Sequence, residues 1–166
     1  MNHDATQKHI KGFEALSLKT YPDSLGVPTV GWGFNLDKEG APARVQTLGL
    51  SHARVLAGKQ TLTIDQADAL FLIDYQDAAY EAEKLIPNFD EHPEPVQTVI
   101  VDMVFNLGMT RFRKFTKLLA ALAAKDYCAA ALEMEDSLWY SQVKRRAVID
   151  VRIVRQYCAG ENKEVV

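Results

Sequence analysis

Residues 12–33 read GFEALSLKTYPDSLGVPTVGWG, and this stretch decides the fold of the chain. Glu14 falls in the last turn of a short helical pattern. Residues 22–26, PDSLG, follow as a turn, because proline fixes φ and because aspartate and glycine tolerate tight geometry. Thr29–Phe34 has the pattern of a returning strand, so residues 18–34 are predicted to form a β-hairpin.

Two acids in this stretch are predicted to differ in protonation. The last turn of a helix carries partial negative charge, and neighbouring apolar side chains desolvate Glu14, so both effects favour its protonated form. Asp23 lies in a polar turn near free backbone N–H groups and is expected to stay ionised. Thr29 adds a hydroxyl on the returning strand. Cleavage of a glycosidic bond needs a proton donor, an opposed carboxylate and a placed water. The alternative is that Glu14 is a surface residue and Asp23 only a turn former.

The rest of the chain is predicted to be helical. Residues 63–66, TIDQ, form a capping box that opens a helix running to about Ile86. Val96–Leu107 is apolar nearly all round, which indicates a buried helix, and Gly108 is its natural end. Further helices are predicted at residues 112–124, 126–134 and 143–157, the last ending near Gly160.

These elements predict an α+β fold, predominantly helical, in a single domain over residues 1–166. A small lobe at about 10–62 carries the hairpin, a connecting helix spans about 63–86, and a helical lobe covers about 94–160. We expect the active cleft to lie between the lobes.

Composition excludes several classes of function. The net charge of -3 argues against a general binder of nucleic acid or of anionic membranes. No stretch reaches the ~18 apolar residues of a membrane span. The N-terminal MNHDATQKH lacks the apolar run of a secretory signal, so we expect synthesis in the cytoplasm. The histidines are scattered without ligand spacing, so no metal site is predicted. Cys128 and Cys158 are expected to be buried free thiols.

Three blocks resemble the phage-type lysozymes, the muramidases of tailed bacteriophages, and they occur in that family's order. The blocks are residues 12–33, then MVFNLG at 103–108, then SLWYSQ at 137–142 with Arg146 following. The likeness covers about residues 10–158. It implies a lysozyme-like two-lobed fold. It also implies hydrolysis of the β-1,4 bond between N-acetylmuramic acid and N-acetylglucosamine in peptidoglycan, without a cofactor.

The resemblance further implies roles for single residues. Glu14 would be the general acid, Asp23 the second catalytic carboxylate and Thr29 the hydroxyl that holds the attacking water. Arg146 would pair with the catalytic glutamate.

The partner that the resemblance implies is the glycan strand of peptidoglycan. Phe105 would line the glycan cleft, and Asn35 and Glu133 occupy positions where the family also contacts sugar. Trp32 could stack on a sugar ring, although a place in the core of the small lobe is an equal alternative. We expect a monomer that does not insert into membranes and that reaches the cell wall through a holin-type pore.

Two features depart from the family's pattern. The family pairs a histidine with an aspartate on the long helix, and here Phe34 stands at the histidine's position while Asp74 keeps the aspartate's. That ion pair is therefore absent, and Asp74 is expected to be solvated or to use another partner. The net charge is acidic, whereas wall-lytic enzymes of this kind are commonly basic, so attraction to an anionic wall is weakened.

Two rival functions stay open at this point. A lytic transglycosylase uses one acid and forms an anhydro-sugar without water, and the presence of Asp23 and Thr29 counts against it. A catalytically silent glycan-binding module would keep its effect after Glu14 is replaced by glutamine.

Overall fold

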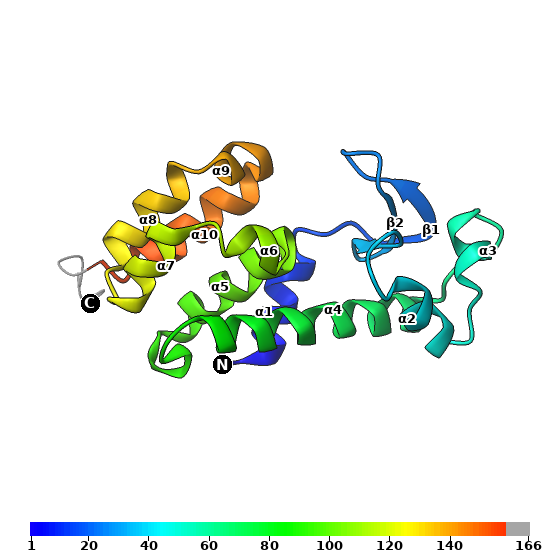
Figure 1. Cartoon of the computed structure of the whole chain (residues 1–166), viewed down its shortest axis with the longest axis horizontal. Coiled ribbons are helices and arrows are strands. Elements are labelled where there is room, and N and C mark those ends of the chain that lie inside the picture. The colour runs from blue at the N-terminus through cyan, green and yellow to red at the C-terminus, as the bar shows by residue number, and fades with distance from the viewer. Residues whose placement is uncertain (159–166) are drawn as a thin grey trace, which may run out of the picture. The chain divides into compact units, whose positions relative to one another are not determined.

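The computed structural model describes residues 1–158 and is mostly helical, with one small antiparallel sheet near the N-terminus (Figure 1). The predicted α+β class is confirmed. The chain divides into two compact units. The sheet unit is residues 10–77, and the helical unit is residues 1–9 together with the chain from Ala78 on.

The sheet unit contains the strands and two short helices, and it shares the long helix α4 with the other unit. Its elements are β1 (Ser17–Pro22), β2 (Pro28–Gly31), β3 (Phe34–Asn35), α2 (Ala41–Thr47), α3 (His52–Leu56) and the first part of α4 (Ile64–Leu85).

The helical unit contains the remaining helices. They are most of α1 (His3–Lys11), the 3-10 helix η1 (Phe89–Glu91), α5 (Glu94–Leu107), α6 (Met109–Phe112), α7 (Thr116–Ala123), α8 (Tyr127–Glu135), α9 (Leu138–Val143) and α10 (Arg145–Arg155). Among the described residues, no helix is long and apolar enough to cross a membrane.

The predicted hairpin is present, but it continues into a third strand. Tyr21 lies opposite Thr29 in the β1–β2 pair, and Thr29 lies opposite Asn35 in the β2–β3 pair. The strand predicted to run through Phe34 ends at Gly31 instead. Gly31 has a φ of 66° and Gly33 a φ of 87°, so the chain turns back between them. Such positive φ values suit glycine, which has no Cβ to clash with the backbone.

The core of the sheet unit lies under β2 and β3. Its buried side chains are apolar and come from both strands, α2, α3, the start of α4 and the connections between these elements, namely Val30, Phe34, Leu36, Ala41, Val45, Leu50, Val55, Leu62, Ala67 and Leu70. Gly31 passes close to α4, since a Cβ built on it would lie 3.4 Å from the Ala67 Cβ. The sheet is therefore fixed on α4 by close backbone approach as well as by apolar burial.

The capping box predicted at the start of α4 is confirmed. The Gln66 N–H donates to Thr63 Oγ1 at 3.2 Å, and the Thr63 N–H donates to Gln66 Oε1 at 2.9 Å. These bonds satisfy backbone groups that have no partner inside the helix. The helix runs from Ile64 to Leu85, within one residue of the predicted range.

The helical unit is organised around α5, which is buried along its length as predicted. Its apolar contacts come from Val96, Val99, Ile100, Val101, Met103 and Val104, and Gly108 caps it with a φ of 73°. Two of its buried residues are polar, Gln97 and Asp102. The buried helix is therefore not purely apolar, and Asp102 needs partners from other elements.

Two predicted helix boundaries in the helical unit are wrong. The helix expected over 112–124 begins only at Thr116, as α7, because Phe115 before it has a ψ of 56°, outside the helical range, and Phe112 instead ends α6. The helix expected to begin at residue 143 begins at Arg145, after Lys144 with a φ of 47°. The helix 126–134 is confirmed as α8 within one residue. Gly160, the predicted end of the last helix, lies outside the described residues.

The prediction of free thiols is also wrong. Cys128 on α8 and Cys158, just beyond α10, form a disulfide with their Cα atoms 4.8 Å apart. Neither residue is fully buried. Sequence spacing did not reveal the pair, because the contact arises from the packing of α8 against α10.

The disulfide should stabilise the folded chain by restricting the unfolded one. It closes a loop with a sequence separation of 30, and a loop of that length corresponds to about 3.6 kcal/mol of unfolding free energy. We expect Cys128→Ser to lower the free energy of unfolding by this amount in urea melts under oxidising conditions. Dithiothreitol should lower the wild-type stability equally and leave the variant unchanged. Equal stability of wild type and variant without reductant would contradict the prediction.

Candidate active site

The predicted site residues fall into two groups, one in each unit. Glu14, Asp23, Thr29, Trp32 and Asn35 belong to the sheet unit, where the loop after α1, strands β2 and β3 and the turns between the three strands carry them. The others belong to the helical unit, namely Phe105 on α5, Glu133 on α8 and Arg146 on α10.

Asp23 shapes the turn between β1 and β2. The backbone N–H groups of Leu25 and Val27 donate to its Oδ1 at 2.8 Å and 2.9 Å. Its own N–H donates to the Val27 carbonyl at 2.9 Å. The backbone donors expected near this acid are therefore present and fix the direction of its carboxyl group.

Glu14 lies just past the end of α1 rather than in its last turn. The helix ends at Lys11, and the Glu14 N–H still donates to the Lys11 carbonyl at 3.3 Å. The dipole argument made from the sequence is therefore weakened, since that effect is confined to the terminal turn. The carboxyl group packs on the turn between β2 and β3, where a Cβ built on Gly33 would lie 2.9 Å from Glu14 Oε2.

Both acids influence the ionisation of Tyr21. Burial raises the pKa of the Tyr21 hydroxyl, and the negative charges of Glu14 and Asp23 raise it further. In a partly solvated site, a negative charge raises the pKa of a neighbouring hydroxyl only over a short range, because water and salt screen it. Sequence reasoning missed Tyr21, although its place directly opposite Thr29 in the hairpin was a usable signal.

Thr29 is 4% exposed and sits in the middle strand, between Tyr21 and Asn35. Its hydroxyl donates to the Val27 carbonyl at 3.0 Å. A hydroxyl has one proton to donate and two lone pairs to offer. With the proton committed to Val27, the oxygen is oriented to accept a hydrogen bond from a water molecule.

Asn35 and Trp32 already have partners within the sheet unit. Asn35 Oδ1 accepts from the Asp37 N–H at 2.7 Å, which leaves its amide NH₂ group to donate. The Trp32 indole N–H donates to Asp68 at 2.7 Å, and its ring is partly buried against the core. Lys11 also bonds Asp68, and this bond lowers the pKa of that carboxyl. The contacts of Trp32 favour the core alternative, and its role in sugar binding stays a prediction.

Asp74 pairs with residues other than a histidine, which was one of the two alternatives predicted from the sequence. It bonds Lys38, and Arg44 donates to it at 2.9 Å. Its side chain is 16% exposed, so the solvated alternative is wrong. Burial raises the pKa of Asp74 against the two cations, and burial lowers the pKa of Lys38 against Asp74. Lys38 also lies 4.1 Å above the centre of the Phe34 ring, so a cation–π contact replaces the family's ion pair.

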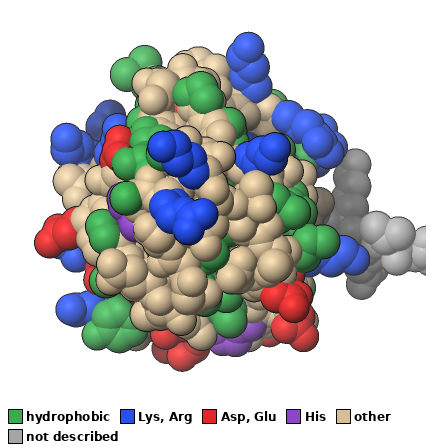
Figure 2. Space-filling view, turned by 90° about the vertical axis from the view of Figure 1, so that its right-hand side faces the viewer, with side chains coloured by type: hydrophobic (Ala, Val, Ile, Leu, Met, Phe, Trp, Pro, Cys, Tyr) green, Lys and Arg blue, Asp and Glu red, His purple; other side chains and the backbone are tan. Residues whose placement is uncertain are grey.

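One face of the sheet unit carries several basic side chains. In the middle of Figure 2, which faces the end of the molecule where β1 and α3 lie, Lys and Arg side chains stand apart among uncharged atoms.

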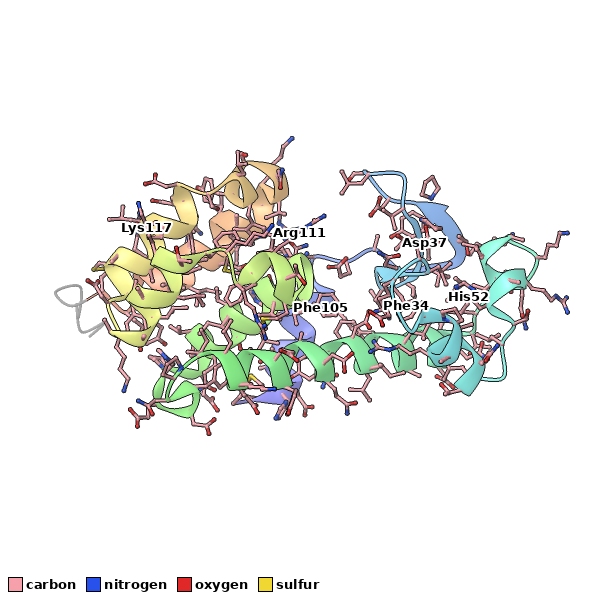
Figure 3. All side chains as sticks on the ribbon, viewed as in Figure 1. Phe34, Asp37, His52, Phe105, Arg111 and Lys117 are labelled. Atoms are coloured by element: carbon pink, nitrogen blue, oxygen red, sulfur yellow. A yellow bond between two sulfur atoms is a disulfide. The ribbon has the colours of Figure 1, made fainter. Side chains whose placement is uncertain are left out.

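The helical unit holds the second group of predicted residues. Phe105 lies near the end of α5 (Figure 3), and both it and Glu133 are partly buried. Arg146 is 6% exposed and donates to both oxygens of Asp102, from Nε at 3.0 Å and from Nη2 at 3.1 Å. The predicted pairing of Arg146 with Glu14 stays a prediction.

Arg146 belongs to a buried charged cluster that the sequence did not reveal. Asp150, one turn further along α10, bonds His9 on α1 at 2.9 Å. Burial raises the pKa of Asp102 to about 7, since it outweighs the charge of Arg146, and Asp150 raises it further. An aspartate in a run of apolar residues, Asp102, indicated that a buried charge needs partners. The sequence could not name His9 as a member of the cluster, because it lies 93 positions earlier in the chain.

A mostly helical fold with one small three-stranded antiparallel sheet is consistent with that of the lysozyme-type glycoside hydrolases. The family model for phage lysozyme matches residues 11–150. The chain belongs to the phage lysozyme family.

Two relatives extend this comparison. The chain is 32% identical over 141 residues to the pre-baseplate central spike protein Gp5 of Enterobacteria phage T4, a match that covers 81% of this chain. The chain spans only 24% of the length of that spike protein. It is also 26% identical over 167 residues to the "Probable T4-type lysozyme 2" of Dictyostelium discoideum, with 93% of this chain and 94% of the relative covered.

Removal of the Asp74 charge should destabilise the sheet unit. Asp74→Asn leaves Lys38 and Arg44, each about three-quarters buried, without their shared carboxylate. Loss of one partner from a buried charged pair costs about 2 kcal/mol or more. Asp77→Asn is the matched control, because Asp77 bonds the same Arg44 but is 56% exposed, and an exposed pair contributes about 0.2–1 kcal/mol. Urea unfolding at pH 7 measures both variants, and an equal loss in the two would contradict the prediction.

Proposed function

We propose that the chain hydrolyses the β-1,4 bond between N-acetylmuramic acid and N-acetylglucosamine in bacterial peptidoglycan. The observation that carries the proposal is that Glu14 and Asp23, nine residues apart in sequence, both raise the pKa of the Tyr21 hydroxyl through their charges, after the larger effect of burial. Membership of the phage lysozyme family supports the same chemistry. The proposed outcome for a bacterium is lysis of its cell wall.

Each of the three catalytic side chains has one task in this proposal. Glu14 protonates the oxygen of the leaving sugar. Asp23 and Thr29 guide a water to the opposite face of the anomeric carbon, with Thr29 Oγ1 accepting from that water while its own proton is held by Val27. This route inverts configuration at the anomeric carbon and requires carboxyl groups roughly 6.5–9.5 Å apart.

The remaining predicted residues have supporting tasks in the proposal. Arg146 pairs with Glu14, and Asp102 fixes the guanidinium group of Arg146 by two hydrogen bonds. Phe105, Asn35 and Glu133 contact the glycan. The Asn35 amide NH₂, which Asp37 does not use, is a suitable donor to a sugar hydroxyl. The enzyme acts as a monomer at the cell wall after release through a holin-type pore.

Glu14→Gln tests the proposal against a silent glycan-binding module. The variant keeps the size of the side chain but has no proton to give, and loss of a general acid lowers a rate by about 10²–10⁴ fold. We expect that loss in a turbidity assay on purified cell walls. Glu83→Gln is the matched control, because Glu83 is exposed on α4, and it should retain the wild-type rate. Equal rates for wild type and Glu14→Gln would refute the assignment.

Gly33→Ala tests whether the close approach of Glu14 to the strand turn matters. Gly33 and Gly26 have similar φ values of 87° and 79°, so alanine strains the backbone equally at both, by about 1 kcal/mol. Only at Gly33 would the new Cβ meet Glu14, at 2.9 Å, whereas nothing lies within 4 Å at Gly26.

We therefore expect the two alanine variants to lose similar stability in urea melts. Gly33→Ala should also lose lysis activity by at least about tenfold, since a misplaced catalytic group is costly. Gly26→Ala should keep most of its activity. An active Gly33→Ala variant would show that the position of Glu14 beside this turn is not used.

A further inference from the structure

The cluster around Asp150 lies inside the helical unit and joins three helices (Figure 1). His9 comes from α1, Asp102 from α5, and Arg146 and Asp150 from α10. The side chains of both acids are 0% exposed, that of Arg146 is 7% exposed, and that of His9 is 17% exposed. Beside it, the hydroxyls of Thr6 and Thr98 lie 2.8 Å apart and give α1 an uncharged contact with α5.

One oxygen of the cluster has no donor. Asp150 Oδ1 contacts His9 Nε2 at 2.9 Å, but among residues 1–158 the buried Asp150 Oδ2 meets no hydrogen-bond partner while both carboxyls are ionised. The neighbouring acid is Asp102, and Asp150 raises the pKa of that carboxyl. Two carboxyl groups can share a hydrogen bond only when one of them carries a proton.

The charges of the cluster do not balance without an added proton. Two carboxylates carry two negative charges, and Arg146 supplies one positive charge. A buried charge that is left uncompensated is strongly destabilising. The missing positive charge can come from a proton on His9, from a proton between the two carboxyls, or from a bound metal ion.

The contacts favour a proton over a metal ion. His9, Asp102 and Asp150 offer ligand atoms within 4.8 Å of one another, close enough for a metal. However, the Arg146 guanidinium already donates to both oxygens of Asp102. A divalent ion bound there would face a fixed positive charge at close range.

We propose that His9, Asp102 and Asp150 form a proton-dependent clamp that fastens α1 to α5 and α10. While the cluster holds its extra proton, its charges balance and α1 is docked through His9. When that proton leaves, two buried carboxylates face a single guanidinium, and docking of α1 is weakened. This inference concerns the helical unit alone and does not depend on the proposed function.

The electrostatic surroundings agree with such a clamp. Burial lowers the pKa of His9, but the hydrogen bond and the charge of Asp150 outweigh it, and the pKa lies above the ordinary value of 6.5. The charge of Asp102 raises it further, and that of Arg146 opposes this. The pKa of Asp102 is raised to about 7 from 3.8, chiefly by burial.

Both shifts give stability the same dependence on pH. A histidine with a raised pKa in the folded state contributes stability that is complete below about 6.5 and is lost as the pH rises through the folded value. Asp102 holds its proton in the folded state between about pH 4 and 7 while the unfolded chain has released it, so stability also falls with rising pH there. His92 acts in the opposite sense, because burial lowers its pKa.

The test compares urea midpoints of wild type and variants between pH 5 and 8, with EDTA present. We expect the wild-type midpoint to fall as the pH rises, with about one proton released on unfolding near pH 7. His9→Gln should show a smaller fall, because glutamine can still donate to Asp150 but does not titrate. Asp150→Asn, which removes the acid common to both pairs, should flatten the curve most.

Matched controls separate the clamp from general effects of substitution. His52→Gln in the sheet unit and Asp90→Asn on the exposed face of η1 should keep the wild-type dependence on pH. Amide exchange should show that α1 loses protection in Asp150→Asn at pH 6, where the wild-type helix is docked. Equal pH dependence in wild type and Asp150→Asn would overturn the proposal.

Two further measurements need no variant to fold. The His9 ring in the wild-type protein, followed by NMR, should titrate above 6.5, and titration at or below that value would overturn the clamp. Zinc chloride added without EDTA should leave the wild-type midpoint unchanged. A rise with zinc that is lost in His9→Gln would show a metal site in place of the proton.

Discussion

The register between β1 and β2, in which Tyr21 lies opposite Thr29, is the constraint on which the site depends. It sets the turn that carries Asp23, buries the Thr29 hydroxyl, and places Tyr21 where both acids act on it. A shift of one residue would turn each of these side chains to the other face of the sheet. The register is held by the hydrogen bonds of Asp23 in the turn and by the close approach of Gly31 to Ala67 on α4.

Each unit of the protein also contains a group of charged residues that are partly or fully buried beside its apolar core. In the sheet unit, Lys38 and Arg44 meet Asp74, and Lys38 also lies over the Phe34 ring. In the helical unit, Arg146 and His9 meet two fully buried acids. Charged groups in such positions stabilise a fold only when each finds its partner, and they specify which helices pack together. They also make stability depend on pH, which an apolar core does not.

The sequence predicted the features that arise from neighbouring residues. The Thr63–Gln66 capping box, the Asp23 turn and the end of α5 at Gly108 follow from local backbone chemistry, and the structure agrees with all three. The sequence did not predict that the strand breaks at Trp32, because Gly31 and Gly33 on either side are compatible with a strand or with a turn. The Cys128–Cys158 bond and the partners of Asp74 were also beyond local pattern, because they join residues about 30 or more positions apart that only tertiary packing brings together.

We propose that a placed water, and not a hydroxyl of the sugar itself, attacks the anomeric carbon while Glu14 protonates the leaving oxygen. Mass spectrometry of glycan fragments from digested peptidoglycan tests this directly. Hydrolysis predicts fragments whose muramic acid ends have gained one water, and the new ends should form with inverted configuration. Fragments that end in anhydro-muramic acid, which lack that water, would contradict the roles given to Asp23 and Thr29.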